Sequence, residues 1–291
     1  VPEPEATESQ VLVEVRAVSL NRGECAALRK AEDGWRPGWD LAGIVARGAA
    51  DGSGPGVGAR VMGWVPGGSW AELAAVRGDH VAEIPAELDL ETASTLPVAG
   101  LTARGLLRLG GDLVGKRVAV TGGAGGVGRF AIQLAAAAGA HVTAVVGRPE
   151  RGEGLKDLGA NEIEVGLGAD GEPFDLILES AGGASLVAAM ARVAPEGVVA
   201  TFGNSSDAPA TFDPRTFYRK GSPTMRGFFV THELLTGRIG SHELAEIAGL
   251  VAAGGLESRI DRRASWREAS SAIGALLGRT VAGKAVLTID Y

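Results

Sequence analysis

The chain of 291 residues is poor in cysteine, tyrosine and histidine. Its single cysteine, Cys25, excludes an internal disulfide and a zinc site built from several cysteines. Four histidines and two tyrosines, Tyr218 and Tyr291, leave few candidates for a general acid. No apolar run reaches the roughly 18 residues that a membrane helix needs. Acidic residues outnumber basic ones to give a net charge of −7, which argues against nucleic acid or an anionic membrane as the main partner.

The chain also lacks an initiator methionine, since it begins at Val1, and no secretion signal precedes its first predicted strand. We therefore expect further residues upstream and a cytoplasmic enzyme. A hydrophobic content of 45% and a charged content of 22% are globular values, and the length fits two domains or one large one.

The pattern of the sequence changes twice. From residue 10 to about residue 97 it is rich in strands and turns, as in VLVEVRAVSL, DLAGIVARG and ARVMGWV. From about 101 to 230 strands alternate with helices, and several strands are continuous apolar runs, as in a parallel sheet covered on both faces. The final predicted strand, residues 284–290, has no obvious partner in this middle region, so we expect it to return to the first domain.

The most informative segment is the glycine-rich turn between residues 116 and 140. Gly123, Gly125 and Gly128 give a G-x-G-x-x-G spacing between an apolar strand and an alanine-rich helix. Glycine lets the backbone turn tightly and approach a pyrophosphate, and the helix start presents free N–H groups. Because strand, turn and helix occur in this order, and another apolar strand follows, the segment predicts a dinucleotide site rather than a purely structural turn.

Seven segments in this order resemble a known family: VSLNRGEC, PGWDLAGIV, GARVMGW, SWAELAAV, LPVAGLTA, GGAGGVG and GKAVL. The chain is similar over its whole length to the medium-chain dehydrogenase/reductase superfamily, on the zinc-independent quinone oxidoreductase side. The resemblance implies an α/β fold with a chaperonin-10-like β domain (1–98 and 235–291) and a Rossmann domain with a doubly wound parallel sheet (99–234). It further implies an active site in the cleft between them and a homodimer built through the Rossmann sheet.

The zinc members of that superfamily carry a cysteine where this chain has Asn21, and a histidine and a glutamate where it has Trp39 and Asp40. Tryptophan cannot ligate zinc, and the four-cysteine structural lobe is absent, so we expect no metal. The resemblance makes Asn21, Trp39 and Asp40 the candidate catalytic residues. The structural alternatives are a turn held by Asn21 and a turn capped by Asp40.

The cofactor choice is predicted at the end of the second strand of the Rossmann domain. NAD sites usually place an acidic residue there to bind the ribose diol, whereas this strand ends in Gly147 and is followed by Arg148 and Arg151. Related reductases bind a 2′-phosphate with a small or polar residue and a lysine at these spacings. We therefore expect NADPH, with a solvated basic loop as the alternative reading.

The resemblance also places Thr102 near the nicotinamide, with a cap at a helix start as the alternative. Segments that follow later strands are expected at the same end of the cofactor, because ligands bind beyond the carboxyl ends of parallel strands. The complete set of expected cofactor-binding residues is Asn21, Thr102, Gly123, Ala124, Gly125, Gly126, Val127, Gly147, Arg148, Arg151, Phe202, Gly203, Gly227, Phe228 and Phe229.

The expected function is an NADPH-dependent, zinc-free transfer of hydride to a small molecule, either a quinone or an activated C=C bond such as an enone. One alternative is an enoyl-thioester reductase of fatty-acid or polyketide metabolism, although the tyrosine that some such enzymes use early in the first domain is absent. In that case water or Asp40 would deliver the proton. Another alternative is a nucleotide-binding protein without turnover. The sequence specifies neither the physiological substrate nor the proton donor.

Overall fold

The computed structural model describes residues 2–290. It divides into two compact units, which we call unit 1 (residues 1–101 with 230–291) and unit 2 (residues 102–229). From the sequence we expected the chaperonin-10-like and Rossmann domains to meet at 98/99 and 234/235, and we keep these limits as a proposal.

Unit 1 is built on a seven-stranded sheet in the order β12-β13-β1-β2-β3-β5, with β4 also paired to β1. Its strands are β1 (Gln10–Leu20), β2 (Asp40–Arg47), β3 (Arg60–Trp64), β4 (Leu73–Arg77), β5 (Val81–Glu83), β12 (Ile260–Ser265) and β13 (Lys284–Thr288). Its helices are α1 (Arg22–Ala27), α2 (Leu90–Ser94), α7 (Val230–Leu235), α8 (Ser241–Ala252) and α9 (Ala269–Leu277), with short 3-10 turns at Leu28–Lys30, Gly78–His80 and Trp266–Glu268.

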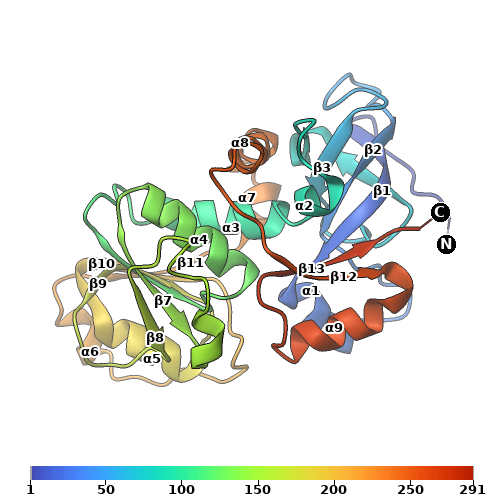
Figure 1. Ribbon diagram of the computed structural model, residues 1–291. Coiled ribbons are helices and arrows are strands. Elements are labelled where there is room, and N and C mark those ends of the chain that lie inside the picture. Colours follow the sequence, from blue (N-terminus) through green and yellow to red (C-terminus); the bar gives the residue numbers. More distant parts are fainter. Residues whose placement is uncertain (1, 291) are drawn as a thin grey trace. The chain divides into compact units, whose positions relative to one another are not determined.

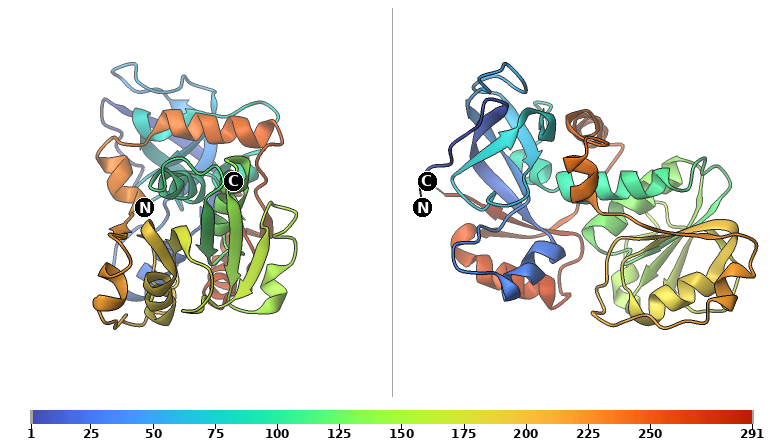
Figure 2. Two further views of the ribbon diagram at one scale, coloured as in Figure 1. Left: turned by 90° about the vertical axis from the view of Figure 1, so that its left-hand side faces the viewer. Right: turned by 180° about the vertical axis from the view of Figure 1, so that it is seen from behind.

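The last strand completes the sheet of unit 1, as expected. β13 pairs antiparallel with β1, with Ala17 opposite Thr288 and Leu20 opposite Ala285. Figures 1 and 2 show the blue first strand and the red last strands together in this sheet. Buried valines and leucines of β1, β2 and β13 form its core. The pairing brings Lys284, at the start of β13, beside the end of β1.

Unit 2 contains a six-stranded sheet in the order β11-β10-β9-β6-β7-β8, and every neighbouring pair in it is parallel. Its strands are β6 (Arg117–Thr121), β7 (His141–Val146), β8 (Glu162–Val165), β9 (Phe174–Glu179), β10 (Val193–Thr201) and β11 (Thr224–Gly227). Its helices are α4 (Gly126–Ala137), α5 (Gly183–Arg192) and α6 (Arg215–Tyr218), with a 3-10 turn at Pro149–Gly152, and α3 (Pro97–Arg108) crosses from unit 1.

The strand order makes this sheet doubly wound, as predicted. The chain leaves β6 through α4 toward β7 and later leaves β9 through α5 in the opposite direction. Because such crossovers are right-handed, α4 and α5 cover opposite faces of the sheet, as Figure 1 shows. Buried strands such as β6 and β9 are apolar on both faces for this reason. The order reverses between β6 and β9, and that switch point is where such sheets bind ligands.

No helix formed by residues 2–290 has both the length and the apolar character needed to cross a membrane.

Candidate dinucleotide and catalytic site

The expected site residues fall into two groups. Asn21, Trp39 and Asp40 lie in unit 1, and the remaining candidates, from Thr102 to Phe229, lie in unit 2.

The glycine turn has the local geometry that a dinucleotide requires. Gly122 adopts a left-handed φ of +65°, which a side chain would strain. A Cβ on Gly128 would collide with the carbonyl oxygen of Gly122 and lie 2.7 Å from the Cα of Gly123. A larger residue at position 128 would therefore push helix α4 away from β6. The third glycine of the spacing is thus required for close packing of the helix on the strand.

Helix α4 begins at Gly126, with Gly125 as its N-cap residue. Since glycine has no side chain, no capping group covers the first N–H groups of the helix, and these groups suit an anion. Ala124 and Val127 complete the turn, and Ala124 is buried. The turn follows β6 at the switch point of the sheet, so its residues fit the pyrophosphate of a dinucleotide.

The residues expected to select the cofactor follow β7, the neighbour of β6. Gly147 is the first residue after the strand, and a Cβ there would meet no atom within 4 Å. Arg148 is exposed with an extended backbone, and Arg151 is partly buried in the 3-10 turn that follows. No carboxylate occupies position 147, so nothing at that position repels a 2′-phosphate.

Thr102 lies in the middle of α3 and is 5% exposed. The alternative reading of this residue as a cap at a helix start is therefore wrong. Phe202 and Gly203 directly follow β10, and Gly227 ends β11. These three residues therefore lie at the carboxyl ends of their strands, where they were expected.

The two phenylalanines after β11 have different surroundings. The ring of Phe228 packs against Gly105 of α3, because a Cβ on Gly105 would lie 2.6 Å from the Cε2 atom of Phe228. The side chain of Phe229 is 60% exposed. Phe228 thus has a packing partner in unit 2.

In unit 1, Asn21 lies at the centre of a buried polar cluster. It precedes α1, and its backbone N–H donates to Oε1 of Glu24 at 2.7 Å. Its side-chain Nδ2 donates to Oδ2 of Asp40 at 2.7 Å and to Oε1 of Glu24 at 3.2 Å. Its Oδ1 accepts from Nζ of Lys284 at 2.8 Å. Both amide hydrogens and one acceptor position of Asn21 are therefore engaged inside unit 1.

Asp40 is the first residue of β2 and is completely buried. Its Oδ1 accepts from the backbone N–H of Val98 at 2.8 Å, so it caps the first turn of α3 rather than a turn of its own. Its Oδ2 also accepts from Ser19 at 3.4 Å and lies 3.4 Å from the Lys284 ammonium. Asp40 therefore has the capping role that was the structural alternative, and it also belongs to the polar cluster around Asn21.

Lys284 supplies the positive charge of the cluster. It is 3% exposed, and its Nζ donates to the carbonyl oxygen of Leu20 at 3.3 Å as well as to Asn21 and Asp40. An ammonium has three hydrogens, and these three acceptors use them all.

The cluster holds two carboxyl groups against one cation, so one carboxyl keeps its proton. Burial, followed by the nearby Asp40 charge, raises the pKa of Glu24 to about 8. Burial also raises the pKa of Asp40, but the Lys284 ammonium and the hydrogen bonds from Asn21 and Val98 oppose this rise. Oε2 of Glu24 is buried and has no hydrogen-bond partner within residues 2–290. The contact with Lys284 favours the ionised form of Asp40, whereas Glu24, with a pKa of about 8, is mainly neutral at pH 7.

This assignment predicts the pH dependence of stability. The folded-state pKa of Glu24, about 8, is above its ordinary value of 4.5, so the unfolded state loses this proton first. The stability that the neutral group contributes is fully present below pH 4.5 and is lost as the pH rises to about 8. We expect Glu24→Gln to reduce this slope, measured by denaturant unfolding across that range, while Asp40, whose pKa is also raised, keeps the remainder. The exposed Glu87→Gln serves as the control, and an unchanged slope in Glu24→Gln would contradict the assignment.

Glu24 and Lys284 were not among the residues predicted for the site. The signal for Lys284 was present in the sequence, because a lone lysine at the start of an apolar strand requires an acidic partner once the strand is buried. Glu24 stands three residues after Asn21, which is the spacing of a capping pair at a helix start.

Trp39 is partly buried beside the start of α1. A Cβ on Gly23 would lie 2.9 Å from the Cη2 atom of Trp39, so the absence of a side chain at position 23 lets the indole approach the helix. The indole of Trp39 therefore lies against α1, the helix that Asn21 precedes.

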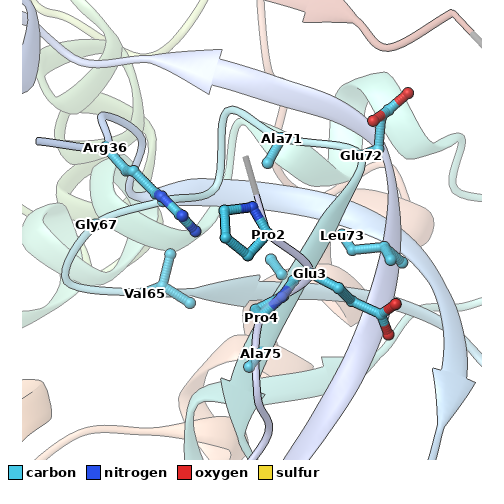
Figure 3. Close-up of a pocket in the computed structure, with 12 residues that line it drawn as sticks. Pro2, Glu3, Pro4, Arg36, Val65, Gly67, Ala71, Glu72, Leu73 and Ala75 are labelled. Carbon is cyan, nitrogen blue, oxygen red and sulfur yellow. The ribbon is translucent and has the colours of Figure 1, made fainter. Parts of the chain in front are cut away.

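Figure 3 shows a cavity of about 340 Å³ in unit 1. Pro2, Glu3 and Pro4 form one wall, and the Arg36 side chain points toward Pro2. None of the residues predicted for the site lines this cavity, so we assign it no part in the proposed chemistry.

Comparison with known proteins places these features in a wider group. Residues 7–86 match the family described as Alcohol dehydrogenase GroES-like domain, and residues 126–251 match the family described as Zinc-binding dehydrogenase. The first match confirms the chaperonin-10-like character expected of the first domain, and the second covers the glycine turn after Gly125.

Among curated proteins, the chain is 28% identical to a quinone oxidoreductase of Pseudomonas aeruginosa over 241 residues, 76% of this chain and 72% of that protein. Several further curated relatives are matched over only 29% to 33% of their own length. Among solved structures, an alcohol dehydrogenase superfamily protein from Novosphingobium aromaticivorans is 32% identical, with a TM-score of 0.87 over 100% of this chain and 94% of that one. The Escherichia coli quinone oxidoreductase complexed with NADPH is 21% identical, with a TM-score of 0.86 over 99% and 94%.

The description of the second matched family mentions zinc. The side chains that could donate to a metal in this chain do not fit a zinc site. His, Cys, Asp and Glu side chains of residues 2–290 form no group of three that could hold a metal ion. Asn21 and Asp40, at the positions where zinc members carry ligands, both contact the Lys284 ammonium. A cation that belongs to the chain therefore already balances the charge at these positions.

Proposed function

Because the chain belongs to the medium-chain dehydrogenase/reductase superfamily, in its quinone oxidoreductase-like group, we propose that it is an NADPH-dependent oxidoreductase that reduces a quinone or an activated C=C bond. The observation that carries this proposal is the glycine turn at the switch point of a doubly wound sheet. NADPH, when bound, supplies the hydride.

The residues of unit 2 bind and orient the cofactor in this proposal. The turn from Gly123 to Val127 and the start of α4 hold the pyrophosphate, and Arg148 and Arg151 bind the 2′-phosphate. Thr102, Phe202, Gly203, Gly227, Phe228 and Phe229 are proposed to lie toward the nicotinamide. The NADPH complex of the Escherichia coli quinone oxidoreductase, which shares this fold, supports the choice of cofactor.

The residues of unit 1 are proposed to bind the substrate and to orient the groups that react. We propose that Trp39 forms an apolar wall for the substrate and that Asn21 lies close to the nicotinamide. Lys284 can only donate and the carboxyl groups accept, so the cluster fixes which way the Asn21 amide points. Asp40 then acts as a positioning residue, since it holds both Asn21 and the start of α3.

The proposal is tested by steady-state oxidation of NADPH with a panel of quinones, enones and enoyl-thioesters. Turnover with quinones or enones supports it, and turnover restricted to enoyl-thioesters would favour the alternative reductase. Binding of NADPH without turnover of any acceptor would indicate a nucleotide-binding protein instead. Full activity after treatment with a chelator is expected, because the donor set does not fit zinc.

We also propose that two copies associate through the edge strand β11. All four of its residues, Thr224–Gly227, are exposed, and the side chain of Met225 is 47% exposed. An unpaired strand edge with apolar side chains is suited to pairing with a second copy. We expect light scattering to give the mass of a dimer and Met225→Lys to give that of a monomer. A monomeric unchanged protein would contradict this proposal.

A further inference from the structure

The carboxyl ends of β6 and β9 are joined by side chains at the point where their backbone pairing stops. The ladder between the two strands ends with Val120 opposite Leu178. Beyond it, the Thr121 hydroxyl donates to the carbonyl oxygen of Leu178 at 3.1 Å and accepts from the backbone N–H of Ser180 at 2.8 Å. The Ser180 hydroxyl donates to the carbonyl oxygen of Thr121 at 3.1 Å. We call this arrangement the Thr121–Ser180 latch.

Glu179 fixes the loop that follows the latch. Its carboxylate is completely buried and accepts from the backbone N–H groups of Ala181 and Gly182, each at 3.0 Å. Gly182 and Gly183 have φ angles of +73° and +50°, so the loop adopts a backbone that few other residues tolerate. A buried carboxylate that accepts two N–H groups holds this conformation strongly.

The latch also connects the loops on either side of it. A Cβ on Gly122 would lie 2.8 Å from the Ser180 hydroxyl oxygen, so the glycine turn directly faces Ser180. On the other side, the backbone N–H of Ser205 donates to the carbonyl oxygen of Ser180 at 3.0 Å, and that of Ser206 donates to Ala181 at 2.8 Å. The loops after β6, β9 and β10 therefore form one hydrogen-bonded rim at the switch point.

We propose that Thr121, Ser180 and Glu179 are positioning residues for the dinucleotide: they set the separation between the glycine turn and the loop after β9, across which the cofactor lies. This inference rests on the proposed function, because it assumes that the switch point binds NADPH. Thr121 is 2% exposed, so it acts through the position of the backbone.

Thr121→Val tests the proposal, because valine keeps the shape of threonine and removes the hydroxyl. We expect the Kd for NADPH, measured by fluorescence titration, to rise about tenfold. In the NADPH-free protein, the amide of Ser180 should exchange its hydrogen faster, because its acceptor is gone. Thr121→Ser should restore both values, since serine keeps the hydroxyl.

Thr143→Val is the matched control. Thr143 is also buried, in the adjacent strand β7, but its hydroxyl donates to Oε2 of Glu162 at 3.3 Å, away from the rim. We expect this variant to lower the thermal midpoint without changing the Kd for NADPH. An unchanged Kd in Thr121→Val, or an equal rise in Thr143→Val, would overturn the inference alone. If the unchanged protein binds no NADPH, the proposed function fails and this inference fails with it.

Discussion

Replacing Lys284 with methionine is expected to lower the free energy of unfolding by about 3–5 kcal/mol, because it leaves the buried Asp40 carboxylate without its cation. Methionine preserves most of the side-chain volume, so the loss is one of charge and hydrogen bonds. Three acceptors, on Leu20, Asn21 and Asp40, lose their hydrogen bond from Lys284 at once. Unfolding in denaturant measures the loss.

A double variant separates the charge from the packing. Asp40→Asn combined with Lys284→Met removes both members of the pair, so we expect part of the stability to return. Lys116→Met is the matched control, because Lys116 is 45% exposed and forms a surface ion pair with Asp175, whose Oδ1 lies 3.9 Å from its Nζ. Such a surface pair contributes less than about 1 kcal/mol. Equal losses in Lys284→Met and Lys116→Met would show that the cluster does not stabilise the fold.

Replacing Arg148 and Arg151 with alanine is expected to weaken NADPH binding roughly ten- to a hundredfold and to leave NADH binding nearly unchanged. A guanidinium binds two phosphate oxygens at once, whereas the diol of NADH has no such charge. Because Arg148 is exposed, we expect the lower part of this range, and added salt should reduce it further. Titration of both cofactors at two salt concentrations gives the values.

The control for this change is Arg259→Ala combined with Arg267→Ala. Both residues are exposed in unit 1, and the change removes the same charge from the protein. A similar loss of NADPH binding in this control would mean that only the overall charge matters. Equal affinity of the unchanged protein for NADPH and NADH would indicate that the segment from Arg148 to Arg151 is a solvated loop.

The sequence was most informative where a local pattern determines the structure. The order of strand, glycine turn and helix around Gly123 predicted the dinucleotide turn, because glycine spacing and apolar runs act over a few residues. The final strand was also assigned correctly to unit 1 from its lack of a partner in the Rossmann region.

The polar cluster could not be derived in the same way. Asn21 and Asp40 were singled out by their positions in family motifs. Lys284, which contacts both of them, lies 244 residues after Asp40 in the chain. No local pattern reports such a pairing, because it depends on the register of β13 against β1. The Thr121–Ser180 latch was missed for the same reason, since its residues are 59 positions apart.

The pairing of β13 with β1 has a consequence for the order of folding. Unit 2 is one continuous segment, residues 102–229, whereas unit 1 combines the first and last parts of the chain. During synthesis, unit 2 is complete before β13 exists, so it can fold while β1 still lacks its pairing with β13. Closing a loop of such length carries an entropic cost that slows association. The Ala17–Leu20 part of β1 is therefore the last to gain its partner strand, whereas the Gln10–Glu14 part can already pair with β4.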